Sequence, residues 1–184
     1  MQGNNELLEF LGKINTKKPY GTALFNALAR VTISLTIDAV CLRLNIKSNK
    51  VEVYLTQRAN NDTAYPGQWH CPNSIFRPSE DYKDVFARLE KREIGGLLGE
   101  KNFIDSFNNP QEVRGHFFSL VYLCSIKKDG LVGRWFSVND LPKNTIVHHR
   151  NHIIPMVLKK FRLRSSLKKN LVQKIKKGNQ SNIF

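Results

Sequence analysis

The chain has 184 residues, of which 41% are hydrophobic, so it is long enough to bury one core and too short to hold two full domains comfortably. Its formal net charge of +14 predicts attraction to polyanions such as nucleic acid, nucleotides or an anionic membrane face, without choosing among them. The three cysteines have no CxxC spacing, which argues against a zinc site or a disulfide framework, and the lack of a signal-peptide pattern or a long apolar run predicts a soluble, cytoplasmic protein.

Two short helices are predicted at the N-terminus. Apolar residues recur at helical spacing in one segment that contains Leu7, Leu8, Phe10 and Leu11, and in a second that contains Leu24, Phe25, Leu28 and Ala29. We expect these helices to form an extension over residues 1–34, ahead of a main domain over residues 35–162.

A β-hairpin is predicted next. The stretches IDAVCLRLNI (residues 37–46) and VEVYLTQRA (residues 51–59) alternate or run apolar and contain many β-branched side chains. The polar segment KSNK between them indicates a turn. A polar loop is expected over residues 60–66, followed by short strands and loop over residues 69–76.

An amphipathic helix is predicted from Glu80 to about Arg92, and the Gly95-Gly96 pair is its expected stop. Its buried stripe would consist of Tyr82, Val85, Phe86 and Leu89. The polar segment after Gly96 is interpreted as a linker. It leads to a long strand, VRGHFFSLVYLCSIKK, and then to GRWFSVNDLP, a strand that closes in a turn.

The last predicted helix runs from His148 to about Lys177, with Pro155 placed in its first turn. Its apolar face would contain Ile153, Ile154, Val157, Leu158 and Phe161. Residues 163–184 are strongly basic and are expected to form a C-terminal helix or tail. The alternation of helices and strands predicts a layered α/β or α+β fold rather than a bundle.

One segment of the chain resembles a known signature. Ser74, Glu80, Arg88, Glu93 and Gly95 follow one another at the spacing of the Nudix box, G-x5-E-x7-R-E-U-x-E-E-x-G-U, where U is a bulky apolar residue. The surrounding sequence, roughly residues 37–158, also resembles Nudix hydrolases. This resemblance implies an α/β/α sandwich with a mixed sheet, Mg²⁺ or Mn²⁺ as cofactor, a nucleoside diphosphate-linked small molecule as substrate, and association into a homodimer.

The segment departs from the signature at metal-binding positions. Leu89 and Arg92 stand where the family has glutamates, and Ser74 stands where it has the first glycine. The altered box resembles that of the GDP-mannose mannosyl hydrolase branch, which keeps the last glutamate and uses Mg²⁺. That branch relies on a histidine just before its closing tryptophan strand, and no histidine stands there in KKDGLVGRW.

The resemblance assigns roles to individual residues. Glu93 and Glu90 are the candidate catalytic residues, and the metal would be held by Glu93, Glu90 and the Ser74 carbonyl, since carboxylate and carbonyl oxygens suit Mg²⁺. Glu80, Arg88 and Gly95 would support the box. Arg58, Trp69 and Arg88 are candidates for substrate binding, because arginine matches phosphate oxygens and tryptophan can stack on a base.

Each assignment has a structural alternative. Glu93, Glu90 and Arg58 could also be surface charges, and Trp69 and Phe76 could be core residues. His148, His149 and His152 invite a metal or base role, although their spacing also fits the exposed start of a helix. Cys71 could be a reactive thiol or an inert buried one.

Two classes of function therefore remain open from the sequence. The first is a divergent Nudix hydrolase that cleaves a nucleoside diphosphate derivative, for example a nucleotide sugar, with Mg²⁺ or Mn²⁺. The second is an inactive Nudix-fold module that binds a nucleotide or RNA. In either case the basic tail could add contacts to nucleic acid or to an anionic surface, and a docking role for the tail alone is a weaker third reading.

Overall fold

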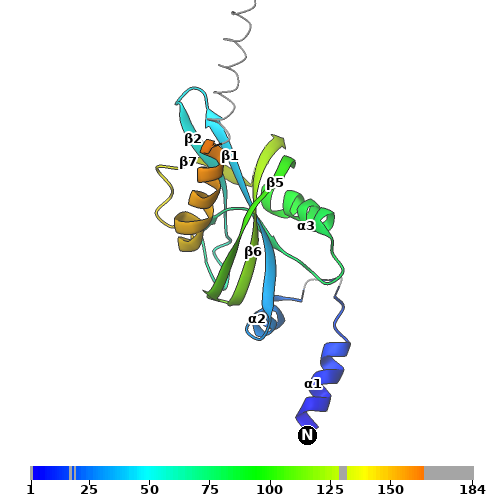
Figure 1. Cartoon of the computed structure of the whole chain (residues 1–184). Helices are drawn as coiled ribbons and strands as arrows, with labels where there is room; N and C mark the ends of the chain where they lie inside the picture. Colours follow the sequence, from blue (N-terminus) through cyan, green and yellow to red (C-terminus); the bar gives the residue numbers. More distant parts are fainter. Residues whose placement is uncertain (1, 17, 19, 129–131, 164–184) are drawn as a thin grey trace, which may run out of the picture.

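The computed structural model describes residues 2–16, 18, 20–128 and 132–163. Figure 1 shows a central sheet with helices around it. In chain order the elements are α1 (Gln2–Gly12), α2 (Thr22–Ala29), β1 (Ile33–Asn45), β2 (Lys50–Gln57), β3 (Trp69–His70), β4 (Asn73–Ile75), α3 (Tyr82–Leu89), η1 (Glu90–Ile94), β5 (Leu97–Glu112), β6 (Gly115–Lys128), β7 (Gly133–Ser137) and η2 (His149–Ile153).

Strand β1 lies at the centre of a mixed sheet with the order β3-β2-β1-β6-β5. It pairs parallel with β6 and antiparallel with β2 and β4, while β7 pairs antiparallel with β2. Every residue of β1 from Thr36 to Leu42 is buried. This run of apolar residues forms a central strand because both of its faces are covered.

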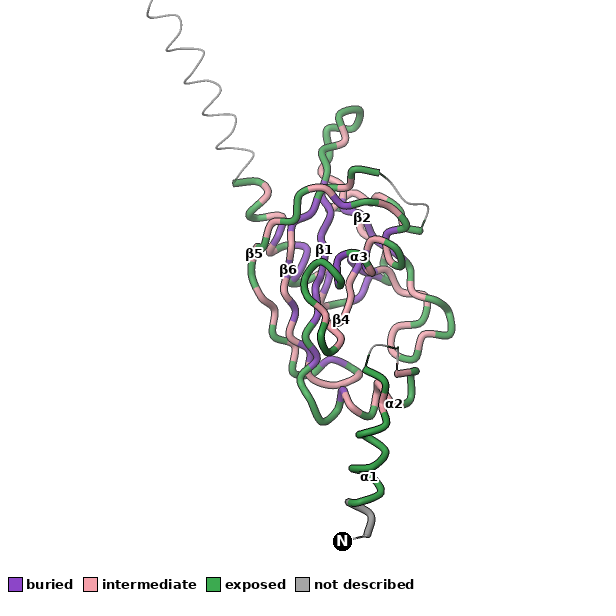
Figure 2. Tube along the Cα trace, turned by 90° about the vertical axis from the view of Figure 1, so that its right-hand side faces the viewer, coloured by how far each residue is buried: buried purple, intermediate pink, exposed green. Residues whose placement is uncertain are grey.

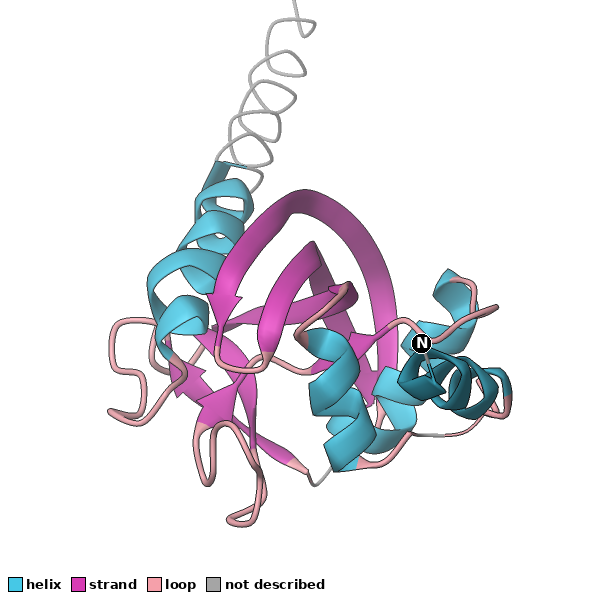
Figure 3. Ribbon diagram, turned by 90° about the horizontal axis from the view of Figure 1, so that it is seen from below, coloured by secondary structure: helices cyan, strands magenta, loops and turns pink. Residues whose placement is uncertain are grey.

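The core has two halves, one on each side of the sheet. Ala39 and Cys41 of β1 pack in a cluster with Val85, Phe86 and Leu89 of α3. Val40 and Leu42 pack in the other with Ile153, Ile154 and Val157 of the C-terminal helix. Because successive strand residues face opposite sides, α3 and the C-terminal helix cover opposite faces, as Figure 3 shows. The expected α+β layered sandwich with a mixed sheet is thus confirmed.

The segment that the sequence presents as a polar linker is strand β5, so that prediction is wrong. β5 runs antiparallel to β6 with several register shifts. It is an edge strand with one face towards solvent, so polar residues alternate with partly buried Ile104 and Phe107. Pro110 is tolerated because an edge strand has backbone N–H groups that need no partner in the sheet.

The helix that carries the box begins and ends differently from the prediction. Asp81 caps α3, accepting hydrogen bonds from the N–H groups of Lys83 and Asp84, so the helix starts at Tyr82 rather than Glu80. After Leu89 the chain continues as the π-helical turn η1, in which the Gly95 N–H donates to the Glu90 carbonyl at 2.9 Å. Gly95 has φ 66°, which confirms the predicted glycine stop.

The C-terminal helix begins at Val147, and Pro155 lies in its interior rather than in its first turn. Proline cannot donate to the carbonyl four residues before it, and its ring crowds that carbonyl. The widened turn η2 lies directly before Pro155, where this conflict falls. The predicted continuation beyond residue 163 lies outside the described residues.

At the other end of the chain, both predicted N-terminal helices form. Figure 2 shows α1 as an exposed helix that extends away from the sheet, and its apolar side chains Leu7, Leu8, Phe10 and Leu11 are all exposed. Helix α2 contacts β6, and Phe25 packs edge-on against Phe117. Among the described residues, no helix is long and apolar enough to cross a membrane.

Candidate functional site

Arg88 ties helix α3 to the loop in front of it. Its Nε donates to Glu80 Oε1 at 3.0 Å, and its two terminal nitrogens donate to the Ile75 carbonyl at 2.6 Å and to Ser74 Oγ. Burial raises the pKa of Glu80, but the hydrogen bonds from Arg88 and from the Arg77 N–H outweigh it and hold that pKa below its usual value. Glu80 and Arg88 therefore brace the loop on which Ser74 and Ile75 lie.

Glu93 projects from η1 into a polar pocket of about 200 Å³. Burial raises the pKa of its carboxyl group, and the positive charges of Arg58, Arg92 and Arg88 oppose this effect. Its Oε2 lies 3.8 Å from Nε2 of buried His70. Since burial lowers the pKa of His70 to about 3, this imidazole is neutral and does not form an ion pair with Glu93.

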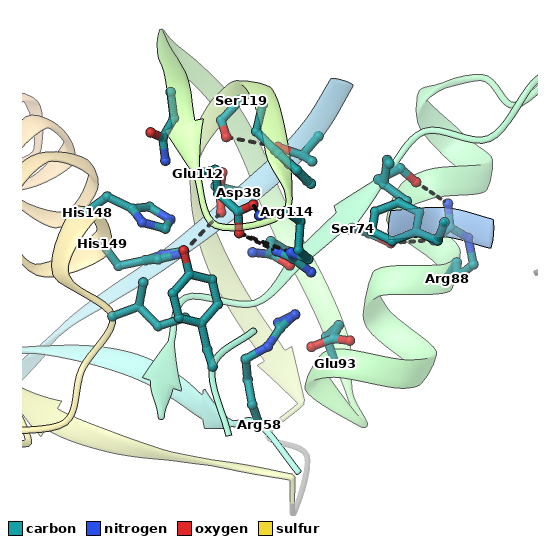
Figure 4. A pocket seen from close by; sticks show the side chains of 18 residues that line it. Asp38, Arg58, Ser74, Arg88, Glu93, Glu112, Arg114, Ser119, His148 and His149 are labelled. Atoms are coloured by element: carbon teal, nitrogen blue, oxygen red, sulfur yellow. Dashed lines mark hydrogen bonds and ion pairs between the residues drawn. The ribbon is translucent and has the colours of Figure 1, made fainter. Parts of the chain in front are cut away.

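Figure 4 shows the pocket between the box and the C-terminal helix, with Arg58 and Glu93 at one end. The Nε of Arg58 donates to Asp62 Oδ2 at 3.1 Å. The other oxygen of Asp62 accepts hydrogen bonds from the N–H groups of Ala64 and Tyr65, so the loop after β2 holds the carboxylate in place. This contact uses Nε, and the terminal nitrogens of Arg58 form no hydrogen bond with the described part of the chain.

A second arginine comes from the turn between β5 and β6. Arg114 donates from Nε and Nη2 to Glu112 Oε1 at 3.0 and 2.9 Å. Its guanidinium group lies 5.0 Å from the centre of the Phe117 ring, and it also approaches the rings of Phe25 and Tyr65. Burial, followed by the charge of Glu112, raises the pKa of Tyr65 to about 12, so its hydroxyl remains protonated.

Asp38 and His149 are two buried members of the polar lining, together with Ser119. Asp38 Oδ1 lies 4.0 Å from His149 Nε2. Burial raises the pKa of Asp38 to about 6, and burial lowers the pKa of His149 well below its usual value. From sequence alone, Asp38 would be placed in a core strand and His149 at the start of a helix. The fold brings these two side chains to one cavity.

A larger cavity of about 880 Å³ adjoins this pocket. The two share Phe25, Ile75 and Arg114 in their linings. The larger cavity is mostly apolar and lies between α2, β1 and the loop after β4, with Phe76 in its wall. The N-terminal extension thus contributes to both cavities.

Comparisons with known proteins bear on the fold. No protein-family model matches the chain, and no curated protein matches it either. Among solved structures, a mutT/nudix family protein from Listeria innocua aligns with a TM-score of 0.58 at 12% identity, covering 73% of this chain and 97% of that one. The NUDIX domain of Shewanella oneidensis NrtR complexed with ADP ribose aligns with a TM-score of 0.54 at 16% identity, covering 84% and 97%. This chain has the Nudix fold.

Coverage differs among these structures. The structure of NrtR with a 27mer DNA aligns with a TM-score of 0.54 at 16% identity. The alignment covers 69% of this chain and 61% of the NrtR chain. The chain spans half of a MutT/nudix family protein from Enterococcus faecalis, with 22% identity, 72% of this chain covered and a TM-score of 0.48. At these identities the likeness establishes the Nudix fold alone.

Within the Nudix fold, the structure separates the predicted site residues into two groups. Arg58, Ser74, Arg88 and Glu93 line the pocket. Glu90 does not: its Oε1 accepts from the Leu98 N–H at 3.2 Å and pairs with Lys101 at 3.1 Å. The π turn explains this separation, since i→i+5 bonding widens the turn and moves residues three apart off a common face.

The other candidates also have defined places. Trp69 packs edge-on against Phe136, 4.8 Å between ring centres, outside the pocket lining. His148 lines the pocket, and burial lowers its pKa to about 4, whereas His152 stacks on Phe107. Cys71 is fully buried, and burial raises the pKa of its thiol well above the usual value.

The donor set does not fit a divalent metal held by the protein alone. No group of three or more His, Cys, Asp or Glu side chains among the described residues is placed to hold a metal ion. Glu93 is the one box glutamate that lines the pocket, and the Ser74 hydroxyl accepts a hydrogen bond from Arg88, while the metal role of the Ser74 carbonyl stays a prediction. Hard divalent cations need several oxygen ligands around one point, and Asp38 and Glu112, which also line the pocket, do not group with Glu93 to supply them.

Sequence reasoning missed Asp38, Glu112 and Arg114. A signal for Asp38 was present, because it is the single charged residue in the apolar run ISLTIDAVCL. A charge in a strand that is buried on both faces needs a polar partner, and it therefore marks a candidate site. Glu112 and Arg114 carried no such signal, since the strand before them resembles a linker.

Proposed function

We propose that the pocket binds a nucleoside diphosphate-linked small molecule. The observation that carries this proposal is Arg58, which lines the pocket, is fixed through Nε by Asp62 and retains its terminal nitrogens for a ligand. A planar guanidinium group forms paired, charge-assisted hydrogen bonds with phosphate oxygens. Arg114 lies in the same lining, where it is paired with Glu112.

The shapes of the two cavities support a ligand of this kind. The polar pocket of about 200 Å³ is of a size for phosphates and a small polar group, whereas the adjoining cavity of about 880 Å³ is mostly apolar. Apolar and aromatic walls suit a nucleoside. Tyr20, Phe25 and Phe76 are the aromatic residues of that wall, and aromatic rings can stack on a base. The ADP ribose in the NrtR NUDIX structure is a ligand of the same class.

Metal-dependent hydrolysis is the second candidate function. The specific observation that favours it is Glu93, which faces the pocket as a half-buried carboxylate beside Arg58, on a box still braced by Glu80 and Arg88. The expectation of Mg²⁺ or Mn²⁺ stays a prediction, because the residues present do not form a metal cage. If hydrolysis occurs, the missing loop histidine argues for cleavage between phosphates rather than at the sugar carbon.

Binding and turnover are tested together. The protein and Glu93→Gln are incubated with Mg²⁺ or Mn²⁺ and a panel of nucleoside diphosphate sugars, dinucleotides and nucleoside triphosphates, and binding of each compound is measured in parallel with EDTA. Binding in EDTA without turnover supports a binding module. Turnover that requires metal and is lost in Glu93→Gln supports the hydrolase. If no compound binds and none is hydrolysed, both proposals are contradicted.

The basic tail is a separate question. Residues 164–184 lie outside the described structure, and their predicted role in binding nucleic acid or an anionic surface stays a prediction. NrtR has been solved with a 27mer DNA, which makes DNA of that length a reasonable first probe. Deleting residues 163–184 should abolish salt-sensitive DNA binding and leave nucleotide binding unchanged; loss of both would show that the tail supports the fold instead.

A further inference from the structure

One end of the molecule brings together parts of several elements. The turn between β1 and β2 projects there as an exposed loop, and the described C-terminal helix ends there at residue 163 (Figure 1 and Figure 2). Strand β6 pairs parallel with β1, β5 pairs antiparallel with β6, and the end of β7 pairs with the start of β2, so three further strand ends lie at this end. We call it the hairpin end, and it comprises residues 43–52, 97–101, 125–128, 137–140 and 159–163.

Aliphatic side chains are exposed at the hairpin end. Ile46, in the turn between β1 and β2, is 89% exposed, the largest fraction for any large hydrophobic side chain among the described residues. Leu44, Leu97 and Leu163 are each more than half exposed. Single exposed aliphatic residues are ordinary, whereas several at one end of a molecule mark a surface that a partner covers.

Exposed lysines surround these aliphatic side chains, namely Lys47, Lys50, Lys127, Lys128, Lys159 and Lys160. Within the described part of the chain none of these lysines has an ion-pair partner, whereas Arg43 pairs with Glu52 at 2.8 Å. Glu100 and Asp140 are the other exposed acidic residues of the hairpin end. Basic side chains therefore outnumber acidic ones there. Residues 164–184, which follow this end in the chain, contain six Lys or Arg residues and no Asp or Glu.

An anionic lipid bilayer matches both features of this surface. Its headgroups attract lysines that lie close to them, and the headgroup region admits aliphatic side chains to a depth of about 5–10 Å. The long stem of lysine lets the ammonium group stay among the headgroups while Ile46 lies deeper.

A nucleic acid matches the charge alone. It has no aliphatic layer to cover Ile46 and Leu44, and proteins that bind single strands present aromatic rings to the bases. The large hydrophobic residues exposed at the hairpin end are all aliphatic. The combination therefore favours lipid over nucleic acid.

We propose that the hairpin end docks on an anionic membrane surface, with Ile46 and Leu44 inserted among the headgroups and the surrounding lysines in contact with anionic lipids. None of these residues lines either cavity, so the proposal does not depend on what the pocket binds. It concerns the folded domain, and it holds whether or not residues 164–184 add further contacts.

The test is co-sedimentation of the full-length protein with vesicles of phosphatidylcholine alone and of phosphatidylcholine mixed with phosphatidylserine. We expect binding to the mixed vesicles only, because neutral headgroups do not attract lysine. Ile46→Ser should lower the partition coefficient about tenfold, since an aliphatic side chain no longer leaves water. Lys47→Glu should lower it about tenfold as well, because an anion replaces a cation near the surface. Val31→Ser and Arg30→Glu are the matched controls at the opposite end, beside α2, and should bind like the wild type.

Four results would overturn the proposal. The first is no binding to either kind of vesicle. The second is binding that Ile46→Ser and Lys47→Glu leave unchanged, which would place the contact elsewhere, for example in residues 164–184. The third is equal weakening by Lys47→Glu and Arg30→Glu, which would show that net charge and not this surface drives binding. The fourth is binding of a DNA oligonucleotide that depends on Lys47 but not on Ile46, without vesicle binding, which would assign the surface to nucleic acid.

Discussion

At the scale of single residues, charge decides what the pocket can bind. Glu93 is the box glutamate that faces it, and three arginines lie close enough to lower its pKa against the opposing effect of burial. In a Nudix box with all its glutamates, a metal would neutralise the phosphates. Here we propose Arg58 for that task, because the carboxylates of the lining are not grouped to hold a cation among the described residues.

The first prediction concerns Arg58. Arg58→Ala should weaken binding of a nucleoside diphosphate by about tenfold or more, because a charge-assisted hydrogen bond contributes about 1.5–3 kcal/mol. Arg58→Lys should recover only part of the loss, since an ammonium group lacks the planar fork. Arg134→Ala, which removes an exposed arginine from β7, is the matched control in the same calorimetric titration. An Arg58→Ala variant with wild-type affinity would place the phosphates elsewhere.

At the scale of elements, the π turn η1 decides which box residues reach the pocket. Leu89 is completely buried and packs with Ile94 and Leu98 in the core under α3. Arg92, by contrast, is exposed. The two positions that have lost their glutamates therefore differ in environment, and they should respond differently when a glutamate is restored.

The second prediction follows from this difference. Leu89→Glu should lower the free energy of unfolding by about 3–5 kcal/mol, because it buries a carboxylate among apolar side chains. Arg92→Glu should change stability little and should weaken nucleotide binding slightly through added negative charge. Urea unfolding of the two variants measures the contrast. A Leu89→Glu protein as stable as wild type would mean that the new side chain turns out of the core.

The sequence predicted some elements well for physical reasons that are local. The hairpin of β1 and β2, the apolar stripe of α3 and the glycine stop at Gly95 all depend on residues close together in the chain. Strand β5 was missed because an edge strand exposed on one face has the composition of a linker. Its identity depends on pairing with β6, which no local pattern records.

The same division applies to the site. The spacing of the box predicted correctly that Ser74, Arg88 and Glu93 lie at one pocket. It did not predict the π turn, which places Glu90 beside Lys101 instead. The pairing of Asp38 with His149 arises from a central strand and a helix at the far end of the chain. Such a pair can be suspected from a lone charge in a strand, although its partner cannot be named before the fold is known.

At the scale of the whole molecule, buried titratable groups couple folding to pH. Burial lowers the pKa of His70 to about 3 and that of His148 to about 4, so the native protein keeps both neutral. Their contribution to stability is present above the unfolded pKa of about 6.5 and is lost as the pH falls. Asp38 has the opposite sign: its pKa is raised to about 6, so its contribution is present at low pH and is lost as the pH rises.

The third prediction is that the free energy of unfolding decreases by several kcal/mol between pH 6.5 and pH 4.5, because the histidine effects exceed those of the opposing carboxyl groups Asp38 and Glu93. Asp38→Asn removes one of the two opposing contributions, so its stability should fall more steeply over the same range. Urea titrations at a series of pH values give both slopes. A pH-independent wild type, or a shallower slope in Asp38→Asn, would contradict these assignments.

The central claim is that the pocket binds a nucleoside diphosphate derivative through arginines rather than through a resident metal. Its most direct test is calorimetric titration of the wild-type protein and Glu93→Gln with ADP-ribose and with GDP-mannose, in EDTA and again with Mg²⁺. We expect at least one of these ligands to bind in EDTA with an affinity that Mg²⁺ changes little, and to bind slightly more tightly to Glu93→Gln, because a nearby negative charge has been removed. Binding that requires Mg²⁺ and disappears in Glu93→Gln would contradict the claim and show that Glu93 holds a working metal.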